Sequence, residues 1–306
     1  MILEKRMINN LWNTVIVLAL GILWASESLL GKITIDRGYS SFDFPLFLTL
    51  GTVLFIIFCC LNPHYRIRIL KINKETLIVL LLTSVTLIFI PYLIIYLSLQ
   101  VITPAETSLF SSLTPLFSLM ISVVWLKNSF SKHNLSGVIV GLVGVAMLIV
   151  PQIGDAGQKE KVAWYLMMLL VPLSYAISGY LLKKTAQLNI SYLQLLLFTN
   201  TISFVLFLAL NGGFIVPSRT SLADIPYFLL GVLFNISALS LMLYLAKSIP
   251  PLILSLSNYA TVIFSFVFTA LYLGNYMNAN IIISMVMILF SSLLVQNEKK
   301  NNLYHE

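Results

Sequence analysis

The stretch "GILWASESLLGK" (residues 21–32) places a carboxylate, Glu27, inside a run that is otherwise apolar enough to cross a membrane. The apolar run extends over 12–35, and a membrane-spanning helix needs roughly 20 apolar residues. An ionised group at the centre of a bilayer costs roughly 2.5–3.5 kcal/mol on insertion scales, so such residues are rare and usually functional. We therefore expect a membrane helix that carries a working polar group.

The composition extends this interpretation to the whole chain. Of the 306 residues, 59% are hydrophobic and only 9% are charged, whereas soluble proteins carry about 25% charged residues. The chain has too few charged residues to form the polar surface of a soluble protein, so we predict an integral membrane protein whose partner is the lipid bilayer. The net charge of +7 does not indicate binding of nucleic acid. The basic residues lie in short loops between apolar runs, where they act as topology signals.

Ten apolar runs are long enough to be spans. They cover 12–35, 42–61, 75–98, 104–126, 133–151, 162–182, 190–211, 223–246, 250–273 and 277–296. The alternating pattern of a β-barrel is absent, so these spans are predicted to be helices. Pro91, Pro115 and Pro172 fall inside spans, where proline bends a helix.

The placement of Lys and Arg predicts the orientation. With a cytoplasmic N-terminus, the inner side would hold Lys5, Arg6, Arg66, Arg68, Lys71, Lys74, Lys127, Lys132, Lys183, Lys184, Lys247, Lys299 and Lys300. The outer side would hold only Lys32, Arg37, Lys159, Lys161 and Arg219. By the positive-inside rule, both termini are predicted to be cytoplasmic.

Two pairs of segments suggest an internal repeat. "LWASESLLGK" (23–32) resembles "SYAISGYLLKK" (174–184), and "TPAETSLFSSLTPLF" (103–117) resembles "IPPLILSLSNYATVIF" (249–264). The halves would be 1–151 and 152–306, each with five spans. Because five is odd, the second copy must insert upside down. Inverted repeats are typical of transporters, with the binding site near the midplane.

These motifs resemble the EamA-type transporters of the drug/metabolite transporter superfamily. The resemblance rests on "LWASES" and on residues 105–150, with a weaker second copy over 254–295. It implies ten helices in two inverted repeats around a central cavity lined by helices 1, 3, 4, 6, 8 and 9. The family often has Glu after helices 4 and 9, where this chain has Asn128 and Asn275, and commonly has a neutral polar residue where this chain has Glu27.

Glu27 is the leading candidate for substrate binding. Its carboxylate could bind an ammonium group, or take up and release a proton during transport. The structural alternative is an ion pair or hydrogen bond with Lys32 or a neighbouring Ser or Tyr. Trp24, Ser28 and Gly31 share its helix face, which would give an aromatic wall, a hydroxyl and a gap around the acid.

Glu106 is the second acidic candidate. In "TPAE" (103–106) it fits a capping box with Thr103 at the N-cap and Pro104 at the first helical position, and it could also line an outer vestibule. The remaining predicted substrate-binding residues are aromatic or amide side chains, which could equally be packing or interface anchors. They are Tyr96, Tyr175, Asn235 and Asn258.

The sequence therefore predicts an all-α secondary transporter of the inner membrane. It would move a small organic metabolite, amino-acid-like or cationic, by alternating access, in the direction of export, and proton coupling is compatible with Glu27. No catalytic residue, cofactor or metal site is predicted, since His64, His133 and His305 lie in loops or the tail. The alternatives are uptake of a phosphorylated or nucleotide-linked solute, for which only Lys32 is a candidate cation, a non-transporting scaffold, and a membrane enzyme. The sequence does not indicate an oligomeric state.

Overall fold

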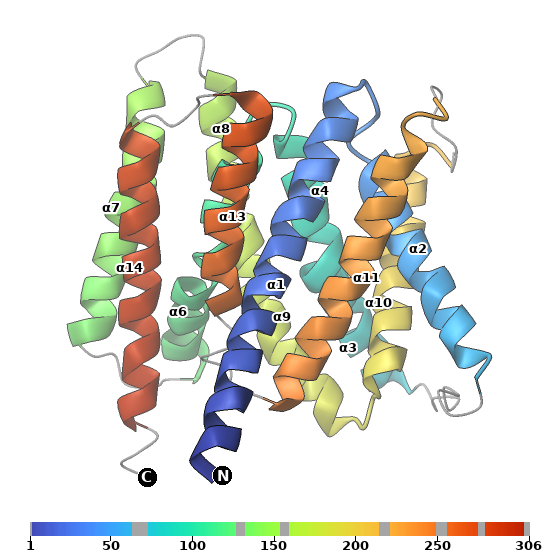
Figure 1. The fold of residues 1–306 in the computed structure, drawn as a ribbon, viewed down its shortest axis with the longest axis horizontal. Coiled ribbons are helices and arrows are strands. Elements are labelled where there is room, and N and C mark those ends of the chain that lie inside the picture. Colours follow the sequence, from blue (N-terminus) through green and yellow to red (C-terminus); the bar gives the residue numbers. More distant parts are fainter. Residues whose placement is uncertain are drawn as a thin grey trace.

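The computed structural model describes residues 2–62, 73–126, 132–153, 159–213, 221–248, 256–274 and 279–302, and all regular structure in these residues is helical. The helices pack side by side as one bundle (Figure 1). Their bounds are α1 (Ile2–Asp36), α2 (Asp43–Cys60), α3 (Lys74–Ser84), η2 (Val85–Phe89), α4 (Ile90–Ser98), α5 (Pro104–Ser111), α6 (Thr114–Leu126), α7 (Lys132–Ile153), α8 (Lys159–Met168), α9 (Leu170–Gln187), α10 (Tyr192–Leu210), α11 (Ile225–Ser248), α13 (Leu256–Leu273) and α14 (Ala279–Asn302).

The predicted all-α membrane fold is confirmed. Eight stretches of the described chain are long and apolar enough to cross a membrane, and the shorter apolar helices Ser257–Leu273 and Ala279–Leu294 occupy the last two predicted spans. Large apolar side chains such as Leu54, Phe58 and Leu271 are exposed on the outside of the bundle. A soluble protein would bury such a surface, whereas here it faces lipid.

Three spans are interrupted where the sequence has an internal proline. The third span passes from α3 through the π-helical turn η2 into α4, whose second residue is Pro91. The fourth span breaks after Ser111, four residues before Pro115, and the sixth breaks after Met168, four residues before Pro172. Proline lacks an N–H and its ring clashes with the carbonyl four residues earlier, which accounts for the position of each break.

Local capping chemistry fixes where several helices begin. The Asn73 side chain accepts a hydrogen bond from the Thr76 N–H at 2.8 Å, at the start of α3. Thr103 and Glu106 form the predicted capping box at the start of α5, and Ser191 and Gln194 form another at α10. These side chains satisfy N–H groups that the first helical turn leaves free.

The helix contacts are symmetric under exchange of the first five spans with the last five. α1 packs against α11 and α13, and its counterpart in the sixth span, α9, packs against α3, α4 and α6. α2 pairs with α10 and α7 with α14, which are counterparts of each other (Figure 1). This is the packing of an inverted repeat. The division at residue 151 stays a prediction, because residues 154–158 lie outside the described chain.

Both ends of the chain lie at one end of the bundle. α1 begins and α14 ends there, and the α1–α2 turn lies at the opposite end (Figure 1). We call these the terminal end and the distal end. Where α7 crosses α14, a Cβ on Gly144 would lie 2.9 Å from Ile288 Cγ1, so the predicted glycine-rich helix permits close contact between the two halves.

Candidate functional site

Glu27 lies in the middle of the Thr14–Asp36 span and is 6% exposed. Tyr96 Oη in α4 donates a hydrogen bond to Glu27 Oε1 at 3.2 Å, and Asn235 Nδ2 in α11 donates to Glu27 Oε2 at 3.0 Å. Asn235 Nδ2 also donates to Tyr92 Oη at 2.7 Å. We call these four residues the Glu27 cluster. In the described chain the hydrogen-bond partners of the carboxylate, Tyr96 and Asn235, are both neutral donors.

The Glu27 cluster joins helices of both halves. Asn235 belongs to α11 in the second half, and the other three residues belong to α1 and α4 in the first. The Thr52 hydroxyl of α2 donates to Asn235 Oδ1 at 3.0 Å and is buried with it. This bond orients the amide so that its N–H groups point toward the carboxylate. The donor set is therefore preorganised by four helices.

The turn η2 and Pro91 bring the two tyrosines onto the face that meets α1. Tyr92 and Tyr96 are four residues apart, so they share a helix face, and their rings meet edge-on with centroids 5.7 Å apart. Isolated π-helical turns occur frequently at functional sites. The gap predicted at Gly31 is filled by Tyr96, since a Cβ there would lie 2.9 Å from Tyr96 Cδ1.

Three other residues predicted to lie around Glu27 have different surroundings in the structure. Tyr175 is half-buried and interacts electrostatically with Glu27. Ser28, the residue after Glu27 on α1, is half-buried. Trp24 packs instead against the apolar cluster that contains Leu20 and Ala238.

Asn258 lies away from the Glu27 cluster along the bundle axis. Ala260 of α13 meets Gly21 of α1, so Asn258 lies near the level of residue 19. At 1.5 Å per residue this is roughly 12 Å from Glu27 along the axis. The structure therefore does not bring Asn258 to the carboxylate.

Lys32 is not the counter-ion of Glu27. Its Nζ pairs with Asp36 Oδ1 at 2.8 Å, one turn further along α1. Tyr272 Oη of α13 donates to the other oxygen of Asp36 at 3.3 Å. Of the structural partners considered for Glu27, the structure contains the tyrosine hydrogen bond and excludes the Lys32 ion pair.

Glu106 is fully buried and has more partners than the sequence predicted. Its Oε2 accepts bonds from the N–H and hydroxyl of Thr103, as the capping box requires. Its Oε1 accepts a bond from Tyr165 Oη at 2.5 Å and pairs with Lys161 Nζ at 2.9 Å. Tyr165 and Lys161 both lie in α8, so this carboxylate ties the fourth span to the sixth.

A cavity of about 120 Å³ opens beside Glu106 at the distal end. Lys161, Tyr165 and Thr269 contribute polar groups, and Phe266 and Leu148 contribute apolar walls. The lining comes from α5, α7, α8, α13 and α14, which belong to both halves. The predicted place of Glu106 at a vestibule therefore corresponds to a real cavity, and Glu27 is not among its lining residues.

Sequence analysis missed Thr52, Lys161 and Tyr165. Lys161 was counted only as a topology signal, and Thr52 and Tyr165 carry no local motif. Among the described residues, no group of three or more His, Cys, Asp or Glu side chains could hold a metal ion. Asn128, Asn275, His64 and His305 lie outside the described chain.

Comparison with known proteins agrees with this geometry. Residues 11–150 match the family model described as the EamA-like transporter family. A solved crystal structure is similar in fold, with a TM-score of 0.58 and 18% sequence identity, and the alignment covers 92% of this chain and 95% of the other. No match was found among curated proteins.

The family match covers the segment that corresponds to the first predicted repeat, and its members are membrane transporters. The similar crystal structure supports the fold over nearly the whole length. The match covers just under half of the chain, so residues 11–150 resemble the EamA-like transporter family, within a chain whose apolar helices make it a multi-pass membrane protein.

Proposed function

We propose that this chain is a secondary transporter that exports a small ammonium-bearing metabolite, amino-acid-like or cationic, by alternating access. The observation that carries the proposal is Glu27. Its carboxylate is buried in the middle of a span, and its partners in the described chain are neutral donors from helices of both halves. A purely structural ion pair would have placed a basic side chain there.

The chemistry of the Glu27 cluster favours a cation. A buried carboxylate without a counter-ion is costly, so it is neutralised either by a proton or by a positively charged solute. Tyr92 and Tyr96 add aromatic faces that attract an ammonium group. Tyr175 is another titratable group that interacts electrostatically with Glu27. Proton and solute exclude one another at one carboxylate, which couples export of the solute to uptake of a proton.

Glu106, Lys161 and the adjacent cavity serve as the outer vestibule in this scheme. Its opposite charges lie side by side, 2.9 Å apart, and suit a solute that carries both an ammonium and a carboxylate. A cavity of about 120 Å³ limits this vestibule to small solutes, because an apolar cavity of roughly 150 Å³ holds a molecule the size of benzene.

The orientation belongs to the same proposal. Both termini lie on the cytoplasmic side of the inner membrane, so the distal end of the bundle is its outer end. The bias of Lys and Arg toward the terminal end supports this assignment. The repeats divide at 151/152, and the site between them lies at the midplane.

Uptake of a phosphorylated or nucleotide-linked solute fits less well. Such a solute needs cationic groups that face the site, and Lys32, the candidate cation, is paired with Asp36. We therefore keep cation export as the proposal.

The test is transport by purified protein in proteoliposomes, screened with amino acids, polyamines and nucleosides. We expect uptake of at least one ammonium-bearing solute, driven by an imposed pH gradient. Glu27→Gln, which is nearly isosteric, should lower the rate at least 100-fold while the melting temperature changes by only a few degrees.

Glu160→Gln is the matched control, since it removes one carboxylate from an exposed position and should transport normally. Wild-type rates in Glu27→Gln at every pH would refute the assigned role. If Glu27→Gln unfolds, Tyr92→Phe tests the same cluster without removing the acid, and an unchanged rate and pH profile in that variant would also count against the proposal.

A further inference from the structure

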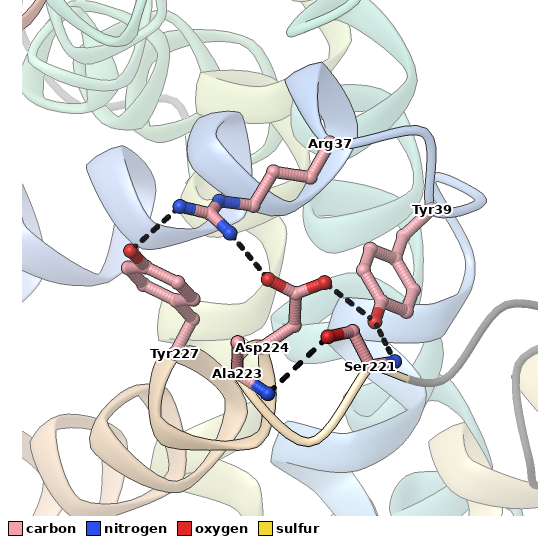
Figure 2. Close-up of polar contacts among 6 residues, drawn as sticks. All are labelled: Arg37, Tyr39, Ser221, Ala223, Asp224 and Tyr227. Atoms are coloured by element: carbon pink, nitrogen blue, oxygen red, sulfur yellow. Dashed lines mark hydrogen bonds and ion pairs between the residues drawn. The ribbon is translucent and has the colours of Figure 1, made fainter.

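A polar network closes the distal end between α1 and α11 (Figure 2). Arg37 follows α1 directly, and Asp224 directly precedes α11. The Arg37 guanidinium donates to Asp224 Oδ1 and, at 2.9 Å, to Tyr227 Oη, and it lies 4.5 Å from the centroid of the Tyr227 ring. Tyr39 Oη donates to Asp224 Oδ2 at 3.0 Å. We call Arg37, Tyr39, Asp224 and Tyr227 the distal lock.

The acid of the distal lock is withdrawn from solvent, while the Arg37 side chain is 42% exposed. The Asp224 side chain is 11% exposed and Tyr39 is buried. The hydrogen bond to Asp224 raises the pKa of the Arg37 guanidinium, and burial raises the pKa of the Tyr39 phenol. Arg37 therefore stays charged and Tyr39 stays a donor throughout the physiological pH range.

A second ion pair lies at the opposite end of the bundle. Lys184 in the last turn of α9 pairs with Glu75 in the first turn of α3, with Nζ 2.9 Å from Oε1. Both side chains are about half exposed, 46% and 55%. An ion pair so exposed holds two helices together only weakly.

The two ion pairs occupy equivalent places in the inverted repeat. α9 in the sixth span is the counterpart of α1, and α3 in the third span is the counterpart of α11 in the eighth. In both pairs the basic residue ends the first or sixth span, and the acidic residue begins the eighth or third. Exchange of the two halves therefore exchanges the helix ends that carry the distal lock with the helix ends that carry the Lys184–Glu75 pair, while the residues themselves are not matched one to one.

We propose that the distal lock and the Lys184–Glu75 pair are two matched gates that tighten alternately. In the described state the nearly buried Asp224 binds both Arg37 and Tyr39 and holds the distal end shut, while the Lys184–Glu75 pair, exposed on both sides, is the weaker gate. Opening of the distal end breaks Arg37 from Asp224 and draws α9 and α3 together around Lys184 and Glu75. This inference rests on the alternating access of the proposed function.

The test measures cysteine reactivity at both ends of the protein in nanodiscs, where reagents reach both faces. In a background with Cys59→Ser and Cys60→Ser, one reporter is Leu30→Cys, because Leu30 is buried in the same cluster as Tyr39 and Phe228. The other is Leu80→Cys, because Leu80 is buried with Ile190 near the terminal end. The probe is a water-soluble maleimide, and the readout is the labelling rate.

Arg37→Gln should raise the labelling rate of the Leu30→Cys reporter at least tenfold and lower that of the Leu80→Cys reporter. Lys184→Gln should have the reverse effect. Lys183→Gln, which removes an exposed neighbouring charge, should change neither rate. The exchange of charges in Arg37→Asp with Asp224→Arg should restore the parent rates.

The reciprocal change distinguishes a gate from local loosening. If Arg37→Gln leaves both rates unchanged, or raises both together, the gate proposal is overturned. If Arg37→Gln does not fold, Tyr227→Phe removes one bond of the lock and should give a smaller change of the same signs; equal rates to the parent would again overturn it. The labelling needs no transported solute, so a failed transport screen leaves this result interpretable by itself.

Discussion

Four carboxylates are buried in the described part of the chain, and two of them pair with a basic side chain. Asp224 has Arg37 and Glu106 has Lys161, so each of these acids has a counter-ion that holds helices together. In the described residues the partners of Glu27 are a phenol and an amide, and those of Asp43 are a backbone N–H and the Asn211 amide. Hydrogen bonds from neutral groups lessen the cost of a buried charge without cancelling it. Of the two acids with neutral partners, Asp43 lies in the first turn of α2, whereas Glu27 lies in the middle of its span, where a transported cation would pass.

The Glu106–Lys161 pair gives a prediction about stability. Lys161→Met should lower the free energy of unfolding by about 1–3 kcal/mol, because the buried Glu106 carboxylate loses its counter-ion. The loss is moderate because the Lys161 ammonium is partly exposed to water. In the double variant with Glu106→Gln, the loss should be smaller than the sum of the two single losses, since a neutral amide no longer needs Lys161. Thermal unfolding of all four proteins in one detergent measures this. Strict additivity would show that the two side chains do not interact.

At the scale of helices, sequence patterns predicted what depends on neighbours in the chain. Hydropathy located the spans, "TPAE" predicted the capping box, and three prolines predicted three interruptions. The helix-face argument put Trp24 on the side of Glu27, and Trp24 packs against a cluster that includes Ala238 of α11, so its place beside the acid stays a prediction.

The contacts that define the site depend on distant segments. Asn235 is 208 residues from Glu27 along the chain, and Asp224 is 187 residues from Arg37. No periodicity or spacing in one sequence encodes which amide or acid will meet which partner after packing. Glu27, Tyr96 and Asn235 could therefore be named as candidates from the sequence, whereas the hydrogen bonds that join them could not.

The contact of the Tyr96 ring with Gly31 of α1 gives a prediction about the site. Gly31→Ala should push the Tyr96 ring away, because the new Cβ would overlap it, and should weaken solute binding at Glu27 by at least tenfold. Gly179→Ala is the matched control, since a Cβ there meets nothing within 4 Å and alanine favours a helix by about 1 kcal/mol over glycine. Transport kinetics and melting temperature of the two variants measure the difference. Equal behaviour of both would mean that Tyr96 is not held by this contact.

At the scale of the whole molecule, the two halves interleave instead of forming separate bundles. α1 of the first half packs between α11 and α13 of the second, and α9 of the second packs against α3, α4 and α6 of the first. Every route through the middle of the protein therefore passes between the halves. A relative movement of the halves changes access to Glu27 and to both gates together, as alternating access requires.

The whole-molecule arrangement predicts which side of the membrane each loop faces. With both termini cytoplasmic, a cysteine at exposed Leu222 should react with an impermeant maleimide added to intact cells. A cysteine at exposed Asn62 should react only after the membrane is opened. Both variants are made without Cys59 and Cys60. The opposite pattern of labelling would invert the topology and, with it, the proposed direction of transport.

The sequence separation between Glu27 and Asn235 also has a consequence for how the protein is made. Tyr96 follows Glu27 after 69 residues, but Asn235 follows only after 208. At about 5–20 residues per second of synthesis, α1 waits roughly 10–40 s in the membrane before α11 exists. During that time its acid has at most one of its two final partners. During synthesis α1 must therefore enter the bilayer with Glu27 protonated, or remain bound to the membrane-insertion machinery until the second half of the chain has been made.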